Sequence, residues 1–191
     1  MPGASCTPSL QFGRKFSIKI GERHNIQSEI DELDNHVIQC YTDGSHIDRK
    51  TGAGIYFKPP LTLEMENQAF SLGRLTTVYQ AEVTAISVSA DIMNKAGITD
   101  QTIMILSDSQ AAIKALASPL VKQKLVGNCI VNLNLLSQNN QVTLMWVPGH
   151  SNIDGNEEAD TLAKTGAHKT YELPEPAVPF SYRKCRLEVR K

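Results

Sequence analysis

Four acidic side chains occupy positions from which they could share a ligand: Asp43, Glu82, Asp108 and Asp160. Asp43 follows the run HVIQCYT and Asp108 follows TIMILS, so both aspartates are expected at strand ends, where ligands gather in α/β sheets. Crowded carboxylates repel one another and must take up protons or gather cations. Their hard oxygens suit Mg²⁺ or Mn²⁺, and two such ions can promote phosphodiester hydrolysis. The set predicts a metal-dependent site of that kind.

Each acid also has an ordinary structural interpretation, which the sequence leaves open. Asp108 could cap the helix expected to follow it, and a helical glutamate such as Glu82 is usually exposed. Asp160 could pair with Lys164 one helical turn later, a contact that contributes only about 0.3–0.5 kcal/mol and would compete with metal binding. Asn156 or Asp154 is expected to cap that last helix, so Asp160 is not needed there.

The elements that must position these acids follow from hydrophobic periodicity. Three β-type runs at 36–42, 52–57 and 67–73 predict an antiparallel meander. A stripe with helical spacing predicts a helix that starts with a Thr77–Gln80 capping box and stops at Gly97. A central strand is expected over 102–108, helices over 109–117 and 120–138, a strand over 141–147 and a helix over 156–166. The fold class is therefore α/β, with a mixed five-stranded sheet flanked by helices.

The rest of the composition limits the class of protein. The 191 residues carry 19 basic and 20 acidic side chains, a net charge of -1, which provides no global attraction to nucleic acid. The four cysteines have no Cys-x-x-Cys spacing, and no signal peptide or membrane span is visible. We expect an intracellular monomer, in the cytoplasm or nucleus, that is neither secreted nor in a membrane. Residues 1–35 are predicted to form an N-terminal arm, 36–167 the domain, and 168–191 a proline-containing basic tail.

Five motifs, in order, carry a resemblance to a known family: YTDGS, YQAE, SDSQAA, WVPGHS and GNEEADTLA. Together they resemble the type 1 ribonuclease H domain over about residues 37–166. Within that family the sequence is most similar to domains attached to the reverse transcriptases of non-LTR retrotransposons of insects.

The resemblance implies an endonuclease that hydrolyses the RNA strand of RNA/DNA hybrids with two Mg²⁺ ions, Mn²⁺ being an alternative. It also implies a reverse transcriptase domain as a partner. The metal ligands it implies are Asp43, Glu82, Asp108 and Asp160. His150 is implied as a histidine on a mobile loop that carries a proton or aids product release. The substrate contacts it implies are Gly44, Ser45, Thr77 and Gln110.

Two departures from the family pattern bear on substrate binding. Val78 and Tyr79 stand where the family tends to have Asn or Gln, and only Lys122 and Lys124 occupy the region of a basic protrusion. Isolated binding to a hybrid is therefore expected to be weak. The alternative function is a degenerate ribonuclease H-fold domain that binds nucleic acid without cutting it. Such a domain should lack at least one carboxylate, and none is missing.

Overall fold

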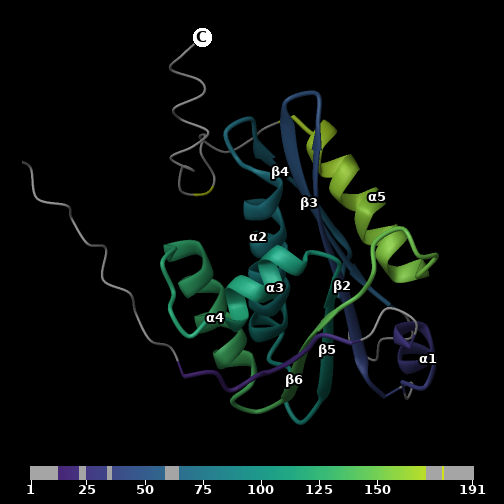
Figure 1. The fold of residues 1–191 in the computed structure, drawn as a ribbon, viewed down its shortest axis with the longest axis vertical. Coiled ribbons are helices and arrows are strands. Elements are labelled where there is room, and N and C mark those ends of the chain that lie inside the picture. The colour runs from purple at the N-terminus through teal and green to yellow at the C-terminus, as the bar shows by residue number, and fades with distance from the viewer. Residues whose placement is uncertain (1–12, 22–24, 34–35, 59–64, 171–177, 179–191) are drawn as a thin grey trace, which may run out of the picture.

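A computed structural model describes residues 13–21, 25–33, 36–58, 65–170 and 178. Its centre is a six-stranded mixed sheet in the order β1-β6-β5-β2-β3-β4, with helices on both faces (Figure 1). The elements in chain order are β1 (Ser17–Lys19), α1 (Ile26–Asp31), β2 (Ile38–Ile47), β3 (Lys50–Phe57), β4 (Gln68–Gly73), α2 (Val78–Lys95), β5 (Thr102–Ser107), α3 (Gln110–Ala117), α4 (Lys124–Leu136), β6 (Gln141–Trp146) and α5 (Asp154–His168).

The sheet joins an antiparallel half to a parallel half. Strands β2, β3 and β4 form the predicted meander, while β5 pairs parallel with β2, and β6 pairs parallel with β5. The predicted α/β class and all five expected strands are confirmed. The strand count was wrong by one, because β1 adds a sixth strand parallel to β6, with Ser17 opposite Thr143. Three residues carry too little pattern to predict a strand, so this one depends on its partner.

The start and stop signals of α2 behave as predicted. The Thr77 hydroxyl accepts from the Gln80 amide, and the Gln80 side chain accepts from the Thr77 backbone, which completes the capping box. Gly97, just beyond the helix, has a φ of 69°, a left-handed conformation that glycine adopts without strain. The capping box fixes the first turn of α2, and with it the position of Glu82 one turn along the helix.

The two faces of the sheet bury separate apolar clusters. Helices α2, α3 and α4 cover one face, and α5 with α1 covers the other (Figure 1). Alternate strand residues point to opposite faces, so Cys40 and Ile105 join the first cluster while Tyr41 and Leu106 join the second. Strand β5 is thus covered on both sides, which explains its nearly continuous apolar sequence.

Two glycines of β3 let α5 lie unusually close to the sheet. A Cβ atom on Gly54 would lie 2.2 Å from the Ala159 carbonyl oxygen, and one on Gly52 would lie 2.1 Å from the Ala167 nitrogen. Any side chain larger than hydrogen would push the helix away. This close contact sets the height of α5, and therefore of Asp160, above the strands.

The N-terminal region contains two elements that no periodic pattern predicts, β1 and α1. The division into an arm at 1–35, a domain at 36–167 and a tail at 168–191 stays a prediction. Residues 1–12, 22–24, 34–35, 59–64, 171–177 and 179–191 of it lie outside the described residues. None of the helices in the described ranges combines the length and apolar character needed to cross a membrane.

Candidate active site

Three of the four predicted acids come together at one end of the sheet. Asp108 lies directly after β5, as predicted, and Glu82 lies in α2. The predicted place of Asp43 at a strand end was wrong, because pairing with β3 continues β2 four residues further, to Ile47. Each of the three acids offers a carboxylate oxygen within 4.8 Å of the others. Strands β2 and β5 are parallel neighbours, with Thr42 opposite Ser107. Two aspartates placed one residue later on each strand must therefore lie side by side.

Gly44 is the reason that Glu82 can join them. A Cβ atom on Gly44 would lie 2.8 Å from the Glu82 nitrogen and 2.9 Å from the Ala81 Cβ, so only glycine allows this approach of β2 and α2. The Gly44 amide also donates to the carboxylates of Asp43 and Glu82. Glu82 is only 5% exposed, which excludes the solvent-facing alternative for this residue.

Burial makes the charges of these acids costly. Desolvation, then the charges of Asp108 and Asp160, raise the pKa of Asp43 to about 7. Desolvation, followed by the negative charges of Asp43 and Asp108, raises the pKa of Glu82 well above its ordinary value. Glu82 Oε2 is buried and has no hydrogen-bond partner. A buried, oxygen-only donor set with an unpartnered atom fits a hard divalent cation.

Asp108 is held by groups on three sides. Its backbone carbonyl accepts from the Trp146 indole Nε1 at 3.0 Å, and a Cβ atom on Gly149 would lie 2.6 Å from Asp108 Oδ2. Burial raises the pKa of Asp108, an effect opposed by a hydrogen bond from Asn156 and by the nearby His150. The capping alternative for Asp108 is wrong, because the Ser109 hydroxyl caps α3 by accepting from the Ala112 amide.

Asp160 lies next to the group of three and is already engaged. Its charge contributes to the raised pKa values of Asp43 and Asp108, so its carboxylate lies near them. The Lys164 ammonium, one turn along α5, donates to Asp160 Oδ2 at 2.5 Å. The predicted competing pair therefore forms, and the structure brings Asp160 to the rim of the acidic group without placing it inside.

His150 lies on the connection between β6 and α5. It is exposed, has a φ of 52°, and lowers the pKa of Asp108 through its charge. A histidine in this left-handed conformation is uncommon, and the residues around it must hold it there. The sequence placed His150 near the acids only through its motif, and the fold brings it to Asp108.

Asn156 is a site residue whose position the sequence analysis misjudged. Neither Asn156 nor Asp154 caps α5, since the cap residue is Ile153 and no side chain makes a capping hydrogen bond. Asn156 is 4% exposed and donates its side-chain amide to Asp108. The sequence contains one signal that could have identified Asn156 as a site residue, its place in the same GNEEAD segment as Asp160.

The four predicted substrate contacts lie around this group. Gly44 and Ser45 continue β2 past Asp43, Thr77 caps α2, and Gln110 is the exposed first residue of α3. The Thr77 hydroxyl is occupied with Gln80, and the Gln110 side chain accepts from Lys114 Nζ at 3.2 Å. Their contact with a substrate stays a prediction.

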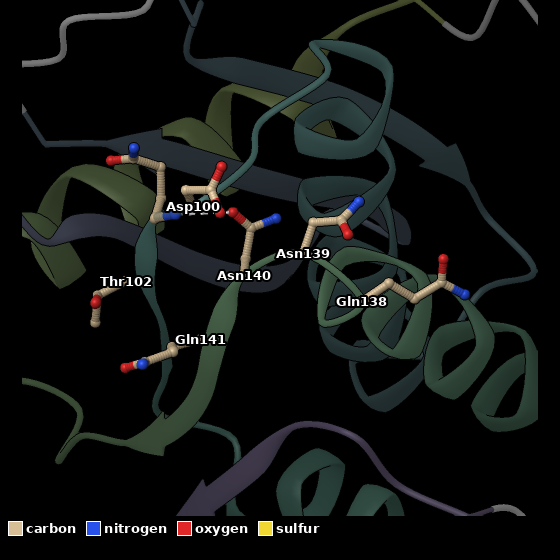
Figure 2. A pocket seen from close by; sticks show the side chains of 7 residues that line it. Asp100, Thr102, Gln138, Asn139, Asn140 and Gln141 are labelled. Carbon is tan, nitrogen blue, oxygen red and sulfur yellow. Dashed lines mark hydrogen bonds between the residues drawn. The ribbon is translucent and has the colours of Figure 1, made fainter.

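A polar pocket of about 500 Å³ lies at the opposite end of the strands (Figure 2). Its walls include Thr102 and Gln141, the first residues of β5 and β6, whereas Asp108 follows the last residue of β5. Asn140 in this pocket is committed to the fold, since its amide donates to the carbonyls of Ile98 and Leu136. The pocket is therefore separate from the acidic site.

The fold and the site together define a mixed α/β domain with a buried carboxylate group at the end of its central strands. The RNase H family model matches residues 35–168, and the chain belongs to the RNase H family. Its fold is similar to that of RNase H1 from the halophilic archaeon Halobacterium salinarum, with a TM-score of 0.53 and 22% identity, covering 68% of this chain and 96% of that one. The predicted family and fold are thereby confirmed.

Proposed function

We propose that this protein is an endonuclease that hydrolyses the RNA strand of RNA/DNA hybrids with the help of divalent metal ions. The observation that carries the proposal is the group formed by Asp43, Glu82 and Asp108, two buried acids and one half-buried acid that each offer a carboxylate oxygen within 4.8 Å of the others. Membership of the RNase H family supports a nuclease. An intact acidic group argues against the alternative, a degenerate domain that only binds nucleic acid.

The acids would act as ligands for two Mg²⁺ ions, or Mn²⁺, with Asp160 as the fourth ligand. Such ions, when bound, polarise the scissile phosphate and lower the pKa of an attacking water. With its pKa raised to about 7, Asp43 is partly protonated near neutral pH, so cation binding there would release protons. Asp160 would first have to give up the Lys164 ammonium.

The remaining residues would bind, orient and move protons. His150, next to Asp108 on an exposed loop, is suited to carry a proton to or from solvent at its imidazole. Asn156 would hold the Asp108 carboxylate in one orientation. Gly44, Ser45, Thr77 and Gln110 would contact the hybrid, where the 2′-hydroxyls distinguish RNA from DNA.

Cleavage assays test this proposal directly. The protein is incubated with end-labelled RNA/DNA hybrid, duplex RNA and duplex DNA, in Mg²⁺ or in EDTA. We expect cutting of the RNA in the hybrid only, dependent on Mg²⁺, and lost in Asp43→Asn. A matched control is Asp91→Asn, because Asp91 is a partly exposed aspartate of α2 that is paired with Lys95 and lies outside the acidic group.

Each outcome separates the two candidate functions. Cutting that persists in EDTA or in Asp43→Asn would contradict the metal-dependent mechanism. Hybrid binding without cutting, under conditions where the protein is folded, would favour the degenerate binding domain.

We also propose that the domain serves reverse transcription in a retroelement, as an intracellular monomer working beside a reverse transcriptase domain. The support is the similarity of the five sequence motifs, together with the few basic residues after α3, which leave phosphate contacts for a partner to supply. Sequencing the natural transcript would test it. A reading frame without a reverse transcriptase would contradict the partnership.

A further inference from the structure

The described residues 13–21 and 25–31 lie outside the region matched by the family, residues 35–168, and yet they are built into the domain. The Asn134 side chain accepts from the Lys15 amide at 2.8 Å and donates to the Gly13 carbonyl at 2.7 Å. Arg14 Nε donates to the Leu116 carbonyl at 2.6 Å, and Phe16 is buried in the first apolar cluster. These contacts lead the chain along α4 into β1.

Helix α1 then buries one side against the face of the sheet that carries α5. Ile26 is fully buried and Ile30 is 3% exposed, and the spacing of four residues puts both on one side of the helix. They belong to the second apolar cluster, whose other members are Tyr41, Leu106, Met145, Val147, Ile153 and Ala159. Figure 1 shows α1 on the same side of the sheet as the beginning of α5.

Three members of this cluster adjoin the active site. Val147 and Ile153 are the two ends of the loop that carries His150, and both are buried. Ala159 is fully buried and directly precedes Asp160. The second apolar cluster therefore contains both the buried side of α1 and the two ends of the His150 loop.

This loop needs support from its ends. His150 and Asn152 have φ values of 52° and 56°, and a left-handed backbone at residues other than glycine costs about 1–2 kcal/mol each. Inside the loop, the only hydrogen bond recorded for the described residues is from the Ser151 hydroxyl to the Gly149 carbonyl. Its backbone anchors lie at the two ends, from the Val147 amide to Ser107 and from the Asn156 amide to Ile153.

We propose that α1 is a positioning element of the active site, in which Ile26 and Ile30 fix both ends of the His150 loop through the second apolar cluster. Among the described residues, α1 also makes the Lys19–Glu29 ion pair at 2.7 Å, but this pair is partly exposed and such pairs contribute little. The inference rests on the proposed function for its effect on catalysis. The predicted effect of α1 on the conformation of the loop is independent of the proposed function.

A comparison of two truncations tests the proposal. Ile26→Ala removes methyl groups from the second cluster, and the matched control Ile98→Ala removes the same groups from the first cluster. Both should lower stability by a similar amount. Only Ile26→Ala should speed amide hydrogen exchange at Val147 and Asn156, the two amides that anchor the ends of the loop, by about tenfold or more. If either variant does not fold, Ile26→Val and Ile98→Val replace them.

A double-mutant cycle with His150→Ala then tests whether Ile26 affects cleavage through His150. Ile26→Ala should lower the cleavage rate about tenfold in the wild type and hardly at all in the His150→Ala background, because both changes affect one group. Effects that multiply, or loop exchange equal in the two truncations, would overturn the proposal. An inactive wild type would refute the proposed function alone, since the exchange comparison needs no activity.

Discussion

The side-chain amide of Asn156 donates a hydrogen bond to the carboxylate of Asp108 from within the first turn of α5. This contact joins the last helix to the end of the central strand. It lowers the pKa of a carboxylate that burial otherwise raises, and so favours the charged form that a cation requires.

Replacing Asn156 with alanine should therefore weaken metal binding. We expect Asn156→Ala to raise the Mg²⁺ concentration for half-maximal activity by about tenfold, within the range of about 10–100-fold for such supporting hydrogen bonds. The measurement is a Mg²⁺ titration of hybrid cleavage. Asn94→Ala is the control, because Asn94 is a part-buried amide that bonds to the Asn132 carbonyl between α2 and α4. An equal change in both variants would show that the effect is only structural.

The ion pair between Lys164 and Asp160 leads to a prediction of opposite sign. Lys164→Met should release Asp160 and remove an ammonium group that would repel a divalent cation at the same carboxylates. The Mg²⁺ concentration for half-maximal activity should then fall by about fivefold, which corresponds to roughly 1 kcal/mol. Stability should change by less than about 0.5 kcal/mol.

Lys95→Met is the matched control for that substitution. Lys95 pairs with Asp91 at 2.7 Å with the same spacing of four residues, on the surface of α2. Its removal should leave the Mg²⁺ requirement unchanged. A Lys164→Met protein that needs as much Mg²⁺ as the wild type would argue against competition at Asp160.

The raised pKa of Asp43 predicts how stability depends on pH without metal. Between the ordinary aspartate value near 4 and the folded value of about 7, the folded protein keeps a proton that the unfolded chain has lost. Unfolding free energy must therefore fall as pH rises through this window, by at most about 4 kcal/mol for Asp43. In EDTA, thermal melting should occur several degrees lower at pH 8 than at pH 5.

Two comparisons check that assignment. Asp43→Asn should melt higher than the wild type at pH 8 in EDTA, and Mg²⁺ should raise the wild-type melting temperature mainly above pH 7. A wild-type protein that becomes more stable from pH 5 to pH 8 in EDTA would contradict the raised pKa.

The close contact of α5 with β3 predicts a packing effect on Asp160. Gly54→Ala places a methyl group 2.2 Å from the Ala159 carbonyl, so α5 must shift. We expect a loss of about 1–3 kcal/mol in stability and a reduced cleavage rate. Gly13→Ala is the control, since a Cβ atom there meets nothing within 4 Å. Chemical denaturation measures the stability, and an unchanged midpoint in Gly54→Ala would be inconsistent with this geometry.

The sequence by itself determined the elements that local pattern controls. The β-type run HVIQCYT, the apolar run of β5 and the Thr77–Gln80 capping box predicted the elements that carry Asp43, Asp108 and Glu82, although β2 continues beyond its predicted end. These signals are local, because hydrogen bonding and burial within one element fix its period. Together with the five motifs, these signals identified the candidate metal-binding acids.

The tertiary structure alone decided which of these side chains meet. Glu82 is buried because Gly44 lets α2 approach β2, and Asn156 bonds to Asp108 across two elements instead of capping its own helix. β1 exists because β6 offers it a partner, and α1 is fixed by a cluster drawn from strands and loops far along the chain. Such contacts depend on the shape and distance of several segments at once, which no window of a single sequence contains.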